Sequence, residues 1–170
     1  MKIALEKWKS EDYEDFFLLS NDKELWGNMS DDFPKTLEEC KQIVHFFSAS
    51  EDITEYIRAI KIDNKIVGCI AAFFETGMYC KNAEISYWLN CEYRGKEIMP
   101  QVIKMFSQCL FTKFDIHRIW ARPFESNRAS QRVLEKAGFI YEGLMRENVY
   151  KNSQYINSKV YALVKKEIQN

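Results

Sequence analysis

The sequence lacks several features that would place it in other protein classes. No stretch approaches the ~20 consecutive apolar residues of a membrane-spanning helix, and Met1 to Trp8 contain no apolar core of a signal peptide. The net charge is -1 and no long basic run occurs. Bulk charge therefore gives no support for binding to nucleic acid or to a membrane surface.

Metal-binding and disulfide patterns are also missing. Five cysteines are scattered without a C-x-x-C pair, and only two histidines are present. An odd, unpatterned set of cysteines is typical of reduced thiols in a cytoplasmic protein rather than of disulfides or a zinc site. We therefore expect a cytoplasmic location and no metal.

The composition that is present predicts a globular protein. Apolar residues make up 46% and aromatic residues 15% of 170 residues, which is enough to form a self-sufficient core. No repeat, low-complexity segment or linker interrupts the chain. We predict one domain over residues 1–170.

Hydrophobic periodicity predicts a mixed α/β layer structure. The expected order is β-α-α-β-β-β-α-β-α-β-β, with residues 20–35 as a loop or short helical pieces. Strands are expected over 3–8, 56–62, 65–74, 82–90, 117–121, 139–150 and 155–165. Four helices are expected, after Ser10, Thr36, Lys96 and Asn127.

Local signals set several of these boundaries. Ser10, Thr36 and Asn127 are suitable N-caps, and Thr36 with Glu39 forms a capping-box pair. Asp63-Asn64 tolerates the positive φ of a tight hairpin turn. Gly138 follows the last predicted helix at the position where glycine ends helices.

Residues 83–99 are the most informative segment. An alternating strand over 83–90 leads into the basic turn Arg94-Gly95-Lys96, and the turn opens a helix. Such a junction presents backbone N–H groups and the positive end of a helix to a phosphate. The segment indicates a phosphate-bearing cofactor.

Four segments in this order resemble the GNAT (Gcn5-related) N-acetyltransferase superfamily. Two of them look like the branch that contains ribosomal-protein N-terminal (alanine or serine) acetyltransferases. Residues 127–139 are the most specific of the four. The segments are Phe33–Cys40, Glu84–Met99, His117–Ile119 with Asn127–Phe139, and Glu142–Glu147.

The resemblance implies a splayed, mostly antiparallel sheet that binds acetyl-CoA. Backbone groups of Trp88, Leu89 and Asn90 would pair with the pantetheine arm. Asn127 and Ser130 would line the cofactor from the last helix. The pyrophosphate would be held by the amides of Arg94, Gly95, Lys96, Glu97, Ile98 and Met99, with charge added by Arg94 and Lys96.

The resemblance also implies direct attack of an amine on the thioester, and hence a need for a base and an acid. Glu84 is the positional candidate for the base, and a salt-bridged structural carboxylate is the alternative. Relatives often have a tyrosine acid where this chain has Leu134. Ser130 is the substitute, with a hydroxyl bonded to helix backbone as its alternative.

The loop departs from the family pattern [Q/R]-x-x-G-x-[G/A]. Glu97 replaces the glycine, Met99 replaces the small residue, and Pro100 follows. Glu97 adds a negative charge, and Pro100 removes one amide donor. Two interpretations follow: weakened but retained cofactor binding, or a degenerate structural loop.

We therefore predict an N-acetyltransferase that uses acetyl-CoA, acting as a monomer or homodimer. The acceptor would be a protein N-terminal amine or a small amine. The alternative functions are a non-catalytic CoA-binding or interaction module and a structural domain that has lost CoA.

Overall fold

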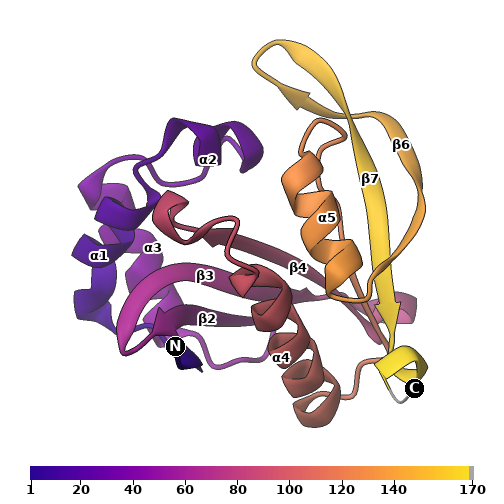
Figure 1. The fold of residues 1–170 in the computed structure, drawn as a ribbon, viewed down its shortest axis with the longest axis horizontal. Coiled ribbons are helices and arrows are strands. Elements are labelled where there is room, and N and C mark those ends of the chain that lie inside the picture. The colour runs from indigo at the N-terminus through magenta and orange to yellow at the C-terminus, as the bar shows by residue number, and fades with distance from the viewer. Residues whose placement is uncertain (169–170) are drawn as a thin grey trace. The chain divides into compact units, whose positions relative to one another are not determined.

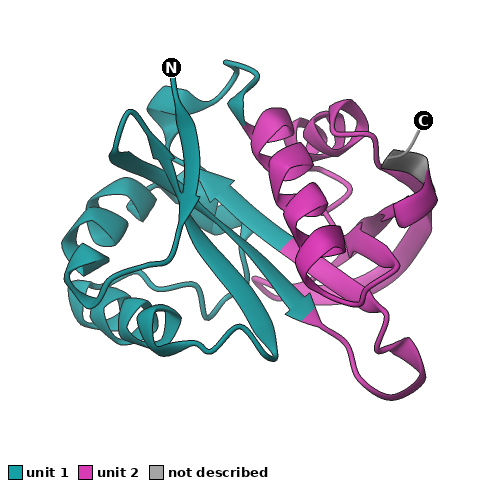
Figure 2. Cartoon of the chain, turned by 90° about the horizontal axis from the view of Figure 1, so that it is seen from below, with its two compact units in different colours: residues 1–73, 86–98 teal, residues 74–85, 99–170 magenta. Residues whose placement is uncertain are grey.

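The computed structural model describes residues 1–168, and they form two compact units (Figure 2). The first unit contains residues 1–73 and 86–98, and the second contains 74–85 and the described residues from 99 onward. Strand β4 (Asn82–Leu89) contributes to both, because the division falls after Ile85.

Seven strands have the order β1-β2-β3-β4-β5-β7-β6 (Figure 1). The β4–β5 pair is parallel, whereas β1–β2, β2–β3, β5–β7 and β6–β7 are antiparallel. This confirms the predicted mixed, mostly antiparallel sheet. The other strands are β1 (Ile3–Glu6), β2 (Glu55–Ile62), β3 (Lys65–Phe74), β5 (Arg118–Ala121), β6 (Ile140–Lys151) and β7 (Gln154–Val164).

Five α-helices are present among the described residues, one more than expected. The additional helix is short and lies within 20–35, where short helical pieces were one expectation. Asp22 begins it by accepting hydrogen bonds from the amides of Glu24 and Leu25. The helices are α1 (Tyr13–Ser20), α2 (Lys23–Asn28), α3 (Leu37–Ala49), α4 (Ile98–Lys113) and α5 (Arg128–Lys136).

The core of the first unit forms where its helices cover one face of its strands. Alternate residues of β2 and β3, among them Ile57, Ala59 and Ala71, point into this cluster, as the period of two in a strand requires. Aromatic rings fill the space between the helices and the strands: Trp8, Phe16, Phe33 and Trp88 are all buried. The Phe16 and Trp88 rings meet edge to face with centroids 5.2 Å apart. Trp88 thus anchors the end of β4 in the core.

The second unit is built on the β5–β7–β6 pairing together with the first half of β4. Ile119 is fully buried on β5, and Leu134 is fully buried on α5. The Tyr161 hydroxyl donates to Glu135 Oε1 at 3.0 Å and so joins β7 to α5. Burial, with the negative charge of Glu135, raises the pKa of Tyr161 to about 12. Tyr161 therefore stays a neutral donor at physiological pH.

Most of the local signals are confirmed. Asp63 and Asn64 have φ values of 48° and 69°, which gives the tight hairpin turn. Asn127 Oδ1 accepts from the Ser130 amide at 3.0 Å, and Gly138 has a φ of 97° just after α5. The expected cap at Ser10 is wrong. Its hydroxyl pairs with the Ser48 hydroxyl at 3.0 Å instead, because a 3-10 turn starts at Ser10 itself.

The Thr36–Glu39 capping box is also confirmed. The Glu39 amide donates to Thr36 Oγ1 at 3.2 Å, and Glu39 Oε2 accepts from the Thr36 amide at 2.9 Å. A third bond comes from the Lys35 amide to the same Oε2 at 2.9 Å. These backbone bonds, from Lys35 first and then Thr36, lower the pKa of Glu39 below its ordinary value of 4.5.

The cap should make stability pH-dependent. A carboxylate with a lowered pKa contributes stability above its unfolded pKa and loses it as the pH falls through the folded pKa. We therefore expect wild type to melt at a higher temperature than Glu39→Gln at pH 7, with the difference vanishing as the pH falls below 4.5. Thermal unfolding from pH 3 to 7 measures this. Glu38→Gln, which changes the preceding carboxylate, should show no such convergence.

The cysteines form no disulfide within the described part of the chain. Burial raises the pKa of Cys40 to about 11 and that of Cys69 to about 12, so both remain thiols. Within residues 1–168, no cluster of three or more His, Cys, Asp or Glu side chains is arranged to bind a metal ion. None of the described helices is long and apolar enough to cross a membrane.

Candidate active site

The predicted cofactor loop leaves β4 at Leu89 and enters α4 at Ile98. Asn90 begins the 3-10 helix η3 (Cys91–Tyr93), and its Oδ1 accepts from the Glu92 amide at 3.1 Å. Gly95 and Glu97 both have left-handed backbone, with φ values of 71° and 56°. Ile98 and Met99 then turn their side chains into the interior, being 1% and 7% exposed. The loop is thus a tight turn in which Glu92, Lys96 and Glu97 are exposed, whereas Asn90 and Arg94 are half-buried.

Glu97 stands where the family pattern has glycine, and its backbone is left-handed. Left-handed φ is the conformation in which glycine is favoured, and a residue with a Cβ pays about 1 kcal/mol or more to adopt it. Glu97 adopts this conformation with a φ of 56°. Pro100 lies within the first turn of α4, where its missing N–H would have no intrahelical partner.

Glu97→Gly should therefore stabilise the protein. Removing the Cβ at a φ of 56° relieves about 1 kcal/mol of strain, a rise in Tm of roughly 2–4 °C. Glu97→Gln keeps the strain and removes only the charge, so its Tm should not show the rise expected for Glu97→Gly. Removing that charge should also tighten acetyl-CoA binding about threefold in both variants. A lower Tm for Glu97→Gly would show that the side chain supports the loop.

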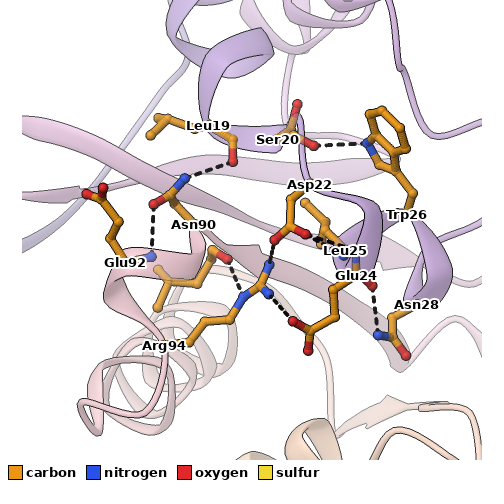
Figure 3. Close-up of polar contacts among 11 residues, drawn as sticks. Leu19, Ser20, Asp22, Glu24, Leu25, Trp26, Asn28, Asn90, Glu92 and Arg94 are labelled. Atoms are coloured by element: carbon orange, nitrogen blue, oxygen red, sulfur yellow. Dashed lines mark hydrogen bonds and ion pairs between the residues drawn. The ribbon is translucent and has the colours of Figure 1, made fainter.

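The Arg94 side chain is held by three groups of the first unit (Figure 3). Its Nη2 lies 2.6 Å from Asp22 Oδ2, and its Nη1 lies 3.2 Å from Glu24 Oε2. Its Nε donates to the Leu89 carbonyl at 3.0 Å. Lys96, by contrast, is exposed, and its Nζ lies 5.7 Å from the centroid of the Tyr93 ring.

The backbone of Trp88, Leu89 and Asn90 is partly engaged. The Asn90 amide donates to the Val67 carbonyl at 2.9 Å, which aligns the end of β4 with β3. The Leu89 carbonyl accepts from Arg94. A Cβ on Gly68 would lie 2.3 Å from the Trp88 carbonyl oxygen, so β3 and β4 approach as closely here as a bare glycine permits.

In the second unit, Glu84 forms a bidentate ion pair with Arg122. Arg122 Nε and Nη2 donate to the two Glu84 oxygens at 2.9 and 3.0 Å. The guanidinium also lies over the Trp120 ring, 4.8 Å from its centroid, and Trp120 Nε1 donates to Glu75 Oε1 at 2.6 Å. Each Glu84 oxygen keeps a second lone-pair site, so the carboxylate can still accept a proton or a further hydrogen bond.

Asn127 and Ser130 lie at the start of α5 in the same unit as Glu84 and Met99. The Asn127 side chain caps this helix, and Ser130 is half-buried in its first turn. Gln131, which is 4% exposed, holds the preceding loop by donating to the carbonyls of Phe124 and Glu125 at 3.2 and 2.8 Å. The helix start is therefore tightly positioned.

The family model of the acetyltransferase (GNAT) domain matches residues 2–140. The chain belongs to the GNAT acetyltransferase family. The probable N-acetyltransferase YjcK of Bacillus subtilis is 31% identical over 137 residues, which are 79% of this chain and 76% of YjcK. Family membership makes the protein an N-acetyltransferase and confirms the resemblance seen in the sequence.

Solved structures share the fold of this GNAT chain. The microcin C7 self-immunity acetyltransferase MccE, solved with acetyl-CoA and AMP, superposes with a TM-score of 0.86 at 21% identity and covers 96% of this chain and 92% of its own. RimL, a ribosomal L7/L12 alpha-N-protein acetyltransferase solved with coenzyme A, has a TM-score of 0.85 at 23% identity, with 96% and 94% covered.

Sequence reasoning missed Asp22, Glu24 and Arg122. Their positions in the sequence did not indicate these ion pairs, because the partners lie far apart along the chain. Asp22 and Arg94 are 72 residues apart, and Glu84 and Arg122 are 38 residues apart. The N-cap pattern Asp22-x-Glu24 was readable as the start of a helix. Its link to Arg94 was not.

Proposed function

We propose that this protein transfers an acetyl group from acetyl-CoA to a primary amine, with residues 1–170 acting as one GNAT domain. The observation that carries the proposal is the loop over Arg94–Met99, which keeps a left-handed residue at the family's glycine position before a 16-residue helix. Such a loop directs backbone N–H groups outward, as pyrophosphate binding requires.

Cofactor binding is assigned to the same residues as the family motif. The amides from Gly95 to Met99 would hold the pyrophosphate, and Lys96 would add positive charge from its exposed position. Backbone groups of Trp88, Leu89 and Asn90 would bind the pantetheine arm. Asn127 and Ser130 would line the cofactor from α5. The Leu89 carbonyl accepts from Arg94, the Asn90 amide donates to Val67 and the Asn90 carbonyl accepts from the Tyr93 amide, so the pantetheine would bind other backbone groups of this segment.

The proposed chemistry is a direct transfer. The neutral amine forms a bond to the thioester carbonyl carbon, and the C–S bond of the resulting tetrahedral species breaks to release CoA thiolate. Glu84 takes the proton lost by the amine nitrogen, directly or through water, while Arg122 fixes the carboxylate. The Ser130 hydroxyl donates a hydrogen bond to the leaving sulfur. The products are an amide and CoA.

The proposed acceptor is a protein N-terminal amine, because segments of the sequence resemble the ribosomal-protein branch and RimL shares the fold. A small amine such as a polyamine is the second candidate, since a chimera of spermidine N-acetyltransferase SpeG also shares the fold, with a TM-score of 0.80. A cytoplasmic location and a monomer or homodimer remain predictions.

Thermal unfolding with acetyl-CoA, CoA and adenosine tests the cofactor site. A ligand at 100 times its Kd adds about 2.7 kcal/mol, a rise in Tm of roughly 5–10 °C for a chain of this size. We expect this rise with acetyl-CoA and CoA and none with adenosine. No rise at millimolar ligand would contradict the proposal and favour a structural domain that has lost CoA.

Turnover separates an enzyme from a binding module. Release of CoA thiol should be measured with peptides that carry a free Ser or Ala N-terminus and with spermidine. Faster release with a peptide than without one supports the proposed acceptor, whereas acceleration by spermidine alone assigns a small amine. Binding without acceleration by any amine would favour a non-catalytic CoA-binding module.

A further inference from the structure

The Arg94 guanidinium lies between two carboxylates that come from a distant part of the chain. Asp22 Oδ2 and Glu24 Oε2 contact its two terminal nitrogens (Figure 3). The Leu89 carbonyl accepts a hydrogen bond from its Nε. All three partners belong to the first unit, as does Arg94. One side chain thus joins the start of the loop, the end of β4 and the start of α2.

The two carboxylate oxygens of Asp22 have different partners. Its Oδ1 accepts the α2 amides of Glu24 and Leu25 at 2.9 and 3.4 Å, while its Oδ2 contacts Arg94. Burial alone would raise the pKa of Asp22, but the Glu24 amide bond and the positive charge of Arg94 outweigh it, so the pKa is lowered. The carboxylate is therefore ionised and matched to the guanidinium at neutral pH.

The Asn90 side chain binds the same loop to a second site in the first unit. Its Nδ2 donates to the Leu19 carbonyl at 3.1 Å, near the end of α1, and its Oδ1 accepts from the Glu92 amide (Figure 3). Asn90 therefore binds the last turn of α1, and Arg94 binds the start of α2. The loop is held at two points before it reaches Gly95.

The charge of Arg94 is already compensated. One guanidinium faces two carboxylates, and the Asp22 and Arg94 side chains are only 19% and 30% exposed. An anion approaching Arg94 would also meet these two negative charges at close range. Arg94 is therefore poorly suited to attract a pyrophosphate by its own charge, which is the role that the loop sequence first suggests.

We propose that Arg94 is a positioning residue. Bound to Asp22, Glu24 and the Leu89 carbonyl, it holds the loop so that the amides after it keep the arrangement that binds the pyrophosphate. Asp22 and Glu24 thereby become part of the cofactor site without touching the cofactor. This inference rests on the proposed acetyl-CoA binding, and it also predicts a property of the loop without ligand.

Asp22→Asn gives the sharpest test. The amide oxygen still accepts the α2 N–H groups, since Asn is as good an N-cap as Asp, but the NH₂ group that replaces Oδ2 offers Arg94 no acceptor. If Arg94 acts by position, Asp22→Asn weakens acetyl-CoA binding. If Arg94 acts by its charge on the pyrophosphate, removing a neighbouring negative charge leaves binding unchanged or tightens it.

Calorimetric titration with acetyl-CoA should compare wild type, Asp22→Asn, Arg94→Gln and the double variant. We expect each single variant to bind about tenfold more weakly. The double variant should also bind about tenfold rather than a hundredfold more weakly, because both single changes remove the same Asp22–Arg94 contact. Arg94→Lys should behave like Arg94→Gln, since an ammonium cannot replace the planar fork. Binding by Asp22→Asn as tight as by wild type would overturn the proposal.

Hydrogen–deuterium exchange of the amides of residues 95–98 supplies the readout without ligand. Exchange should be faster in Asp22→Asn and Arg94→Gln than in wild type. Lys61→Gln removes another ion pair of the first unit, the 2.7 Å contact of Lys61 with Glu6, and should leave loop exchange unchanged. If wild type fails to bind acetyl-CoA, the proposed function fails, and the exchange data still decide the role of Arg94. Equal exchange in all variants would exclude that role.

Discussion

Replacing Glu84 by Gln should lower kcat for acetyl transfer about 100-fold, the usual contribution of a positioned general base. The amide keeps one oxygen for Arg122 but cannot take the amine proton. Acetyl-CoA affinity should change little, because Glu84 is not among the residues assigned to cofactor binding. Release of CoA thiol with a peptide bearing a free N-terminus measures kcat, and titration calorimetry measures Kd.

Glu75→Gln is the matched control for this change. Glu75 is a carboxylate of the same cluster, and a Gln oxygen can still accept from Trp120 Nε1. We expect Glu75→Gln to retain most of the wild-type kcat. If Glu84→Gln also keeps kcat within about threefold while its Tm falls, the carboxylate serves the Arg122 ion pair and the base lies elsewhere.

Replacing Gly68 by Ala should cause a large loss of stability. The added methyl group would lie 2.3 Å from the Trp88 carbonyl oxygen and 3.1 Å from Leu89 Cα, and neither backbone atom can move without separating β3 from β4. Overpacking of this kind costs about 3 kcal/mol, a fall in Tm of roughly 6–12 °C. Acetyl-CoA binding should weaken as well, since the displaced segment is Trp88–Asn90.

Gly27→Ala is the control for a glycine substitution in the same unit. No atom lies within 4 Å of a Cβ at Gly27, and the residue is within α2, where alanine is the better helix former. Its Tm should equal or slightly exceed that of wild type. A Gly68→Ala variant with wild-type Tm would show that the two strands tolerate a wider spacing at this point.

Local signals in the sequence were sufficient for most of the fold. The Thr36–Glu39 box, the Asp63-Asn64 turn and the Asn127 cap each form among residues at most three positions apart. Their geometry follows from the chain itself, whatever the rest of the protein does. The same holds for the alternation of β2 and β3, whose inward residues form the core.

The short helix α2 and the cap at Ser10 show where local reasoning was insufficient. Ser10 is a suitable cap by residue type, but its hydroxyl meets Ser48 of α3, 38 positions later. Residues 23–28 contain Gly27, a weak helix former, yet they form a helix that Asp22 begins and Arg94 supports from the loop. At Ser10 a tertiary contact outweighed the local preference, whereas in α2 the contact with Arg94 adds to the local cap at Asp22.

The sequence by itself determined the family and the succession of strands along the chain, and it predicted which segment carries the cofactor loop. Family, strands and loop all depend on periodicity and on motifs of neighbouring residues. Only the tertiary structure decided what the side chains of that loop do. Arg94 is neutralised by Asp22 and Glu24, 72 and 70 residues away, and Glu84 is paired with Arg122. Glu97 adopts the left-handed backbone of a glycine. An ion pair stabilises charges that folding brings together, and no spacing along the chain reveals which charges those are.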